Sequence, residues 1–147
     1  MSLSDWEKSG WLKAHQTSRE EIQNLLNIVR RDLKDSEVKG LTEDWHFAIA
    51  YNAALQICTI ALYCMGYKPY RGQSEHYRVI QSLVFTLGPD YEQIRNYLNN
   101  CRAKRNISDY DMVGTISSNE AKELVHTTNR LFNDLLKWLE ENFRKYI

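Results

Sequence analysis

The chain has 147 residues, a length typical of one domain with a hydrophobic core of its own. Its 19 basic residues are balanced by 19 acidic ones, which excludes a uniformly basic surface that holds nucleic acid indiscriminately. With 43% hydrophobic residues, six glycines and two prolines, the composition also excludes a disordered, collagen-like or low-complexity chain.

Long intervals that are nearly free of glycine and proline predict helices. The first is expected from about Ser18 to Lys39, because Ser18 and Glu21 have the spacing of a capping box. An apolar stripe follows at Ile22, Leu25, Leu26, Val29 and Leu33. The second helix is expected from Thr42 to Met65, before Gly66.

The stretch from Phe47 to Tyr67 contains no charged residue and is long enough to span a membrane. However, Asn52, Gln56 and Thr59 lie within it, and no basic flank sets an orientation. A helix surrounded by other helices is also apolar on every side. We therefore expect it to be the central helix of a bundle and predict no membrane association.

Three more helices are predicted, over Ser74 to Leu87, Pro89 to Asp109 and Ser117 to Phe143. About five helices joined by short turns predict an all-α up-and-down bundle. We expect residues 1–17 to form an N-terminal extension and residues 18–147 to form the bundle domain.

The cysteines, Cys58, Cys64 and Cys101, are odd in number and lie in apolar or helical sequence. This indicates reduced packing residues rather than a disulfide framework. The N-terminus carries acidic and basic residues before any apolar run, unlike a signal peptide. We therefore expect a cytoplasmic protein.

The sequence contains no glycine-rich phosphate loop, no CxxC and no pair of histidines at helical spacing. We therefore predict no metal site and no cofactor. The histidines at positions 15, 46, 76 and 126 are spread one to a segment. A surface or hydrogen-bonded structural role is expected for each.

One polar cluster has the parts of a phosphodiester or nucleotide site. Arg102, Arg105, Asn106 and Asp109 share one helical face, and Tyr110 follows Asn106 by four residues. Arginine offers a planar fork of donors to phosphate, asparagine can orient an oxygen, and a tyrosine hydroxyl can exchange a proton. The alternative is an ordinary solvated face, on which Arg105 pairs with Asp109 and Arg102 caps a carbonyl.

A second basic cluster surrounds the turn before the third predicted long helix. It comprises Lys68, Arg71, His76 and Arg78, with Glu75 as the acidic residue among them. Such a patch could contact a phosphate backbone, although exposed basic turns without that role are common.

The helical layout, the segment from Trp45 to Gln56 and the Arg105-Asn106 pair resemble the HEPN superfamily, over about Ser18 to Trp138. In that family an arginine, often followed by asparagine, precedes a histidine. In many members two protomers bring these residues together as a metal-independent ribonuclease. Many are toxins paired with a nucleotidyltransferase-type antitoxin.

The resemblance implies that Arg105, Asn106 and Tyr110 are the catalytic candidates. Tyr110 stands five positions after Arg105, where the histidine is usual, and its pKa near 10 makes tyrosine a poor base at neutral pH. His76 could supply an imidazole from another helix. The implied substrate-binding residues are Arg102, Asp109, Asp111, His76 and Arg78.

Two functions follow as expectations. The first is an RNA- or nucleotide-phosphate-binding protein that acts as a homodimer, with metal-independent ribonuclease activity of the toxin type as the expected reaction if it cleaves RNA. The second is a non-enzymatic homodimeric interaction module that binds a partner such as a nucleotidyltransferase-type antitoxin.

Overall fold

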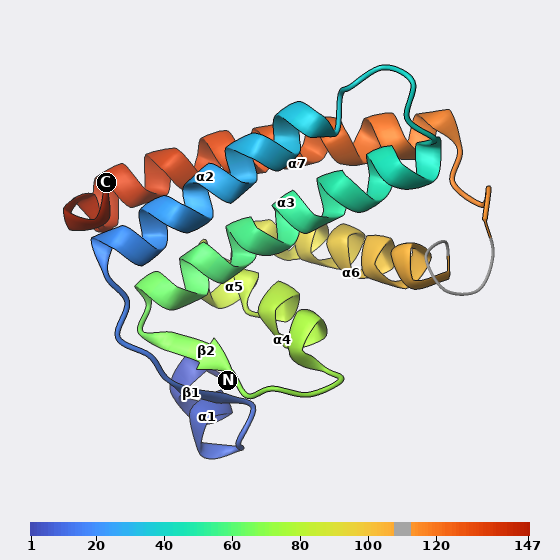
Figure 1. Cartoon of the computed structure of the whole chain (residues 1–147). Helices are drawn as coiled ribbons and strands as arrows, with labels where there is room; N and C mark the ends of the chain where they lie inside the picture. The colour runs from blue at the N-terminus through green and yellow to red at the C-terminus, as the bar shows by residue number, and fades with distance from the viewer. Residues whose placement is uncertain (108–112) are drawn as a thin grey trace.

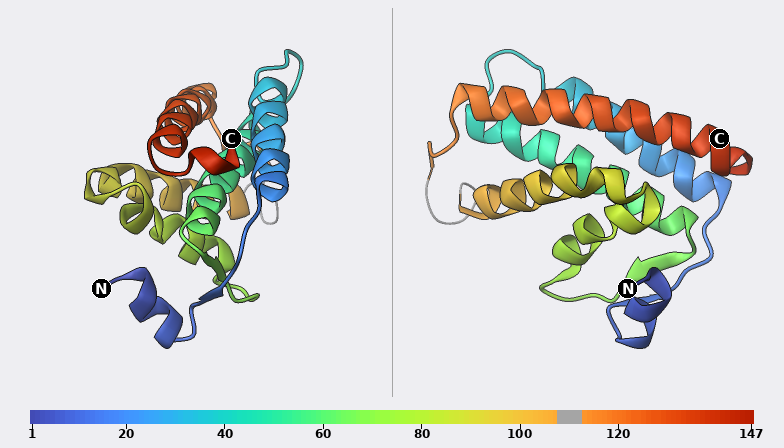
Figure 2. Two further views of the ribbon diagram at one scale, coloured as in Figure 1. Left: turned by 90° about the vertical axis from the view of Figure 1, so that its left-hand side faces the viewer. Right: turned by 180° about the vertical axis from the view of Figure 1, so that it is seen from behind.

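The computed structural model describes residues 1–107 and 113–147. Helices α2 (Arg19–Asp35) and α7 (Ser118–Asn142) both pack along α3 (Glu43–Cys64), as Figure 1 shows. Helices α4 (Glu75–Gln81) and α6 (Glu92–Asn106) pack against α3 from below and behind (Figures 1 and 2). The predicted all-α bundle is thus confirmed, with α3 as its central helix.

Shorter elements complete the described fold: α1 (Leu3–Lys8), β1 (Leu12–Ala14), β2 (Tyr67–Pro69), α5 (Leu83–Thr86) and the 3-10 turns η1 (Pro89–Tyr91) and η3 (Arg144–Tyr146). Strands β1 and β2 pair antiparallel. They are absent from the sequence prediction because three residues are too few to show an alternating pattern. The N-terminal residues also enter the common core, where Leu3, Trp6 and Leu12 are buried.

Side-chain caps begin the helices where the sequence predicts them. The Ser18 hydroxyl accepts a hydrogen bond from the Glu21 amide at 3.1 Å. Ser117 and Glu120 form a complete capping box at the start of α7. Each cap satisfies backbone N–H groups that have no partner within the helix.

The predicted helix over residues 74–87 is two helices, α4 and α5, with Ser82 between them. Ser82 is fully buried, and its hydroxyl donates to the Val79 carbonyl oxygen at 2.6 Å. A serine that bonds to a preceding carbonyl competes with the regular helical ladder, which accounts for the break. Similarly, Pro89 begins the turn η1 instead of α6 itself.

The core is built around α3, whose Tyr51 and Phe47 are 1% exposed. By length and composition α3 could cross a membrane, but 67% of its apolar stretch is buried inside the fold. This burial is that of a core helix, as predicted. The three cysteines are free and buried, which confirms their expected packing role.

Candidate functional site

The predicted arginine face of α6 points into a pocket of about 210 Å³. We name it the arginine pocket, and it is lined by Gly72, Gln73, Glu75, His76, Arg102, Arg105 and Asn106. Arginine spacing on α6 therefore places two guanidinium groups on one side, as the sequence indicated. The other wall comes from α4 and the loop that precedes it.

Aromatic rings hold both guanidinium groups in place. The guanidinium carbon of Arg105 lies 5.6 Å from the centre of the Tyr51 ring, and that of Arg102 lies 5.5 Å from the Tyr77 ring. Arg102 also donates from Nε to the Asn99 side-chain oxygen at 3.1 Å. Both arginines are half-buried and line the pocket, and these ring contacts restrict their guanidinium groups.

His76 brings an imidazole to the same pocket. Desolvation of the ring and the positive charge of Arg105 lower the pKa of His76, while Glu75 acts in the opposite direction. At neutral pH the imidazole is therefore uncharged and able to accept a proton. The sequence left its direction open because α4 and α6 meet only in the tertiary fold.

Tyr51 lies behind the pocket on α3. Its side chain is 1% exposed, and its hydroxyl has no hydrogen-bond partner among the residues that the structure describes. Burial raises the pKa of Tyr51 although Arg105 and Arg102 act to lower it, so the phenol stays protonated. No sequence pattern singled out this residue, because a tyrosine in an uncharged helix has the pattern of an ordinary core residue.

The other predicted site residues fall elsewhere. Arg78 does not line the arginine pocket, and its guanidinium carbon lies 4.9 Å from the Trp11 ring centre. Asp109, Tyr110 and Asp111 lie outside the described residues. The structure thus brings together four predicted residues, Arg102, Arg105, Asn106 and His76.

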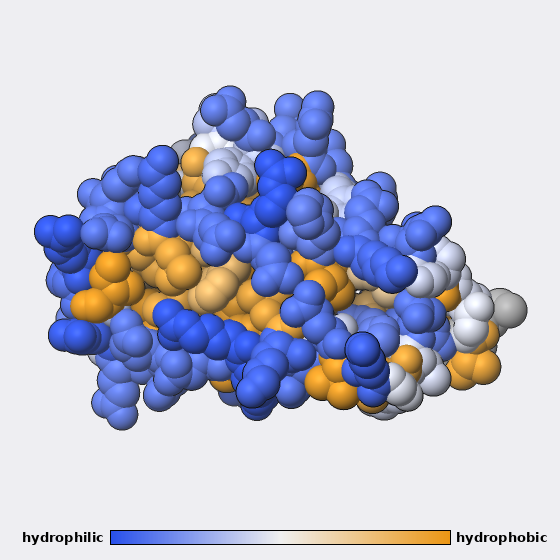
Figure 3. Space-filling view, turned by 90° about the horizontal axis from the view of Figure 1, so that it is seen from above, coloured by the Kyte–Doolittle hydropathy of each residue, from blue (hydrophilic) through white to orange (hydrophobic). Residues whose placement is uncertain are grey.

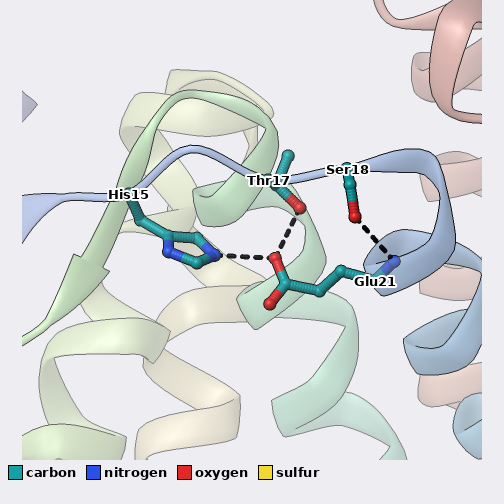
Figure 4. A network of polar contacts seen from close by, with 4 residues as sticks. All are labelled: His15, Thr17, Ser18 and Glu21. Carbon is teal, nitrogen blue, oxygen red and sulfur yellow. Dashed lines mark hydrogen bonds and ion pairs between the residues drawn. The ribbon is translucent and has the colours of Figure 1, made fainter.

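A polar network that the sequence did not predict joins the segment after β1 to α2 (Figure 4). The Glu21 carboxylate lies 2.6 Å from His15 Nε2 and accepts a hydrogen bond from the Thr17 hydroxyl at 2.6 Å. Desolvation acts to raise the pKa of Glu21, but the bonds to Thr17 and His15 together lower it. The His15 ring also packs 4.5 Å from the Tyr63 ring, so the network ties this segment to α2 and α3.

A larger pocket of about 540 Å³ lies between the C-terminal end of α2, the start of α3 and α7. We name it the α2–α7 pocket, and its lining includes His46, His126, Ala121 and Val125. The His46 ring nitrogen Nε2 lies 2.7 Å from the Val38 carbonyl oxygen, which is a structural contact.

In the described part of the chain, the cysteine thiols stay protonated at neutral pH and the potential metal ligands do not gather in a group of three or more. Burial raises the pKa of Cys58 and Cys64 to about 12 and that of Cys101 to about 11, so none is a thiolate at neutral pH. Within residues 1–107 and 113–147, no three His, Cys, Asp or Glu side chains group as metal ligands.

The chain matches no model of a known protein family, no curated protein and no solved structure. The functional interpretation therefore rests on the chemistry of the arginine pocket and its surroundings.

Proposed function

We propose that the arginine pocket binds a phosphate group of RNA or of a nucleotide, in a HEPN-like protein. The observation that carries this proposal is the convergence of Arg102, Arg105 and His76 from two helices on one pocket of about 210 Å³. Guanidinium groups match the geometry of phosphate oxygens and stay charged at every physiological pH.

The remaining pocket residues suit the groups next to a phosphate. The Asn106 amide can donate to a phosphate or sugar oxygen, and the Glu75 carboxylate can accept from a ribose hydroxyl. The neutral His76 ring adds a nitrogen that can accept a hydrogen bond or a proton, which the arginine side chains cannot do. This mixture favours a ribonucleotide phosphate over a simple inorganic anion.

On RNA, the same groups support cleavage by internal transesterification. His76 takes the proton of a ribose 2′-hydroxyl, the 2′ oxygen forms a bond to phosphorus, and the bond from phosphorus to the 5′ oxygen breaks. Arg102 and Arg105 stabilise the charge that builds on the phosphate oxygens. Tyr110 is the proposed proton donor to the leaving 5′ oxygen, at the position where the resembled family has histidine.

The test is binding and cleavage of mixed cellular RNA in EDTA. We expect Arg105→Gln to lose binding and His76→Gln to lose cleavage while retaining binding, because the two side chains have different roles. Tyr110→Phe should slow cleavage only. Arg130→Gln on α7 is the matched control, since it removes one exposed guanidinium away from the pocket.

Circular dichroism of each variant checks that the fold is intact. Binding that survives Arg105→Gln at full strength would contradict the proposal, and absence of cleavage by the unmodified protein would leave phosphate binding without the ribonuclease step.

A second candidate function is a homodimeric interaction module, which one surface feature favours. Figure 3 shows an apolar strip flanked by hydrophilic side chains on the face that carries α2 and α7. The α2–α7 pocket lies at the C-terminal end of α2, and Val125 of α7 is half-buried in its lining. Apolar surface with a polar rim is typical of a protein interface.

We propose that a second copy of the chain occupies this strip. An antitoxin-type protein is the partner that the resulting homodimer would bind. Light scattering should give a dimer mass for the unmodified protein and a monomer mass for Val125→Glu. Val113→Glu is the control, because Val113 is 87% exposed and outside the pocket. A monomer mass for the unmodified protein would refute this candidate.

A further inference from the structure

The two-stranded sheet places two lysines directly opposite each other. Lys13 on β1 is the register partner of Lys68 on β2, so both side chains leave the same face of the sheet. Like charges at directly opposite positions destabilise an antiparallel pair. An anion bound near both ammonium groups offsets this cost.

The two lysines line a second basic pocket of about 160 Å³. We name it the lysine pocket, and its lining is Lys13, Tyr63, Lys68, Pro69, Arg71 and Glu75. The lining therefore contains three cationic side chains and one carboxylate, that of Glu75. In the described part of the chain, Lys13, Lys68 and Arg71 make no ion pair.

Glu75 in the lining offsets one of the three positive charges, which leaves the lysine pocket with a net positive charge. Glu21 feels the charge of Lys68, but its carboxylate is already engaged by His15 and Thr17. The Lys13 ammonium lies 5.4 Å from the Tyr70 ring centre, a contact that leaves its charge in place.

The lysine pocket and the arginine pocket are neighbours. Glu75 lines both, and Arg71 in one is followed directly by Gly72 and Gln73 in the other. An anion that enters the lysine pocket is therefore next to any phosphate held in the arginine pocket.

We propose that the lysine pocket is a second phosphate-binding site, and that the two pockets together bind successive phosphates of one RNA strand rather than a mononucleotide. The pairing of the two pockets rests on the function proposed for the arginine pocket. A bound phosphate also offsets the repulsion between Lys13 and Lys68, so the residues that weaken the sheet alone become favourable in the complex.

The test compares two probes, a labelled single-stranded RNA of about ten nucleotides and adenosine 5′-monophosphate. The variant is Lys13→Gln with Lys68→Gln. The matched control is Lys34→Gln with Lys137→Gln, which removes the same charge from exposed positions on α2 and α7. Fluorescence anisotropy gives the RNA affinity at several salt concentrations, and calorimetry gives the affinity for the mononucleotide.

We expect the pocket variant to weaken RNA binding about tenfold or more and to lower the slope of log affinity against log salt by about 0.7, the value for one lost phosphate contact. Mononucleotide binding should change less than about twofold. The unliganded pocket variant should melt about 1–3 °C higher at low salt because the repulsion is gone. The control should change RNA binding less than about twofold.

Equal RNA affinities for the pocket variant and the control would overturn the second site. A matching loss of mononucleotide binding would also overturn it, because the lysines would then act at the arginine pocket. Arg105→Gln separates the two proposals. If it leaves RNA binding unchanged while the lysine variant reduces it, the proposed function fails and the lysine pocket stands as an independent phosphate site.

Discussion

The buried hydroxyl of Tyr51 allows a test of the pocket's construction. Because this group is 1% exposed and lacks a hydrogen-bond partner among the described residues, it carries a desolvation cost of about 1–3 kcal/mol. Tyr51→Phe removes the hydroxyl and keeps the ring under Arg105. We expect the free energy of unfolding to rise by about 1 kcal/mol, which corresponds to an increase of about 2–4 °C in Tm for a chain of this length.

Thermal and urea unfolding measure this change, with Tyr51→Leu as the comparison. The leucine variant also loses the hydroxyl but removes the ring that Arg105 packs on, so it should weaken phosphate binding while Tyr51→Phe leaves binding within about twofold. A loss of more than about 1 kcal/mol in Tyr51→Phe would refute the reasoning, because it would mean that the hydroxyl has a partner in the folded protein.

Two further predictions concern ion pairs outside the pocket. The pKa of Glu21 lies below its ordinary value of 4.5, so its carboxylate stabilises the fold above pH 4.5, and this contribution is lost as the pH falls through the lowered pKa. Because the side chain is 37% exposed and solvent screens its charge, Glu21→Gln should cost less than about 1 kcal/mol at pH 7 and should flatten the fall in Tm below pH 4.5. An unchanged acid profile would contradict the assignment. The hydrogen bond from Lys104 lowers the pKa of Glu120 at an exposed contact between α6 and α7. Lys104→Gln should therefore cost less than about 1 kcal/mol, and melting in 1 M salt should abolish the difference; a larger, salt-insensitive loss would exclude a screened surface pair.

Local sequence patterns predicted most of the helical layout. Ser18 and Ser117 marked helix starts because capping depends on residues within one turn. Arg102 and Arg105 were placed on one face because three-residue spacing fixes that face in any α-helix. The predicted kinship with the HEPN superfamily remains a prediction.

Tertiary features were beyond these patterns. His76 joins the arginines only because α4 and α6 meet in space, and the Lys13–Lys68 pair depends on two strands of three residues each. The helix break at Ser82 arises from one side-chain hydrogen bond that competes with the backbone ladder. Neither contacts between segments nor such competition has a periodic signature in the sequence.

The titration of His76 by NMR, with and without saturating adenosine 5′-monophosphate, tests the arginine pocket most directly. In the free protein we expect a pKa of His76 below its ordinary value, since desolvation and Arg105 disfavour the charged ring. A phosphate bound in the same pocket should raise that pKa, and Arg105→Gln should abolish the effect of the nucleotide. A His76 titration that the nucleotide leaves unchanged in the unmodified protein would contradict the proposed phosphate site.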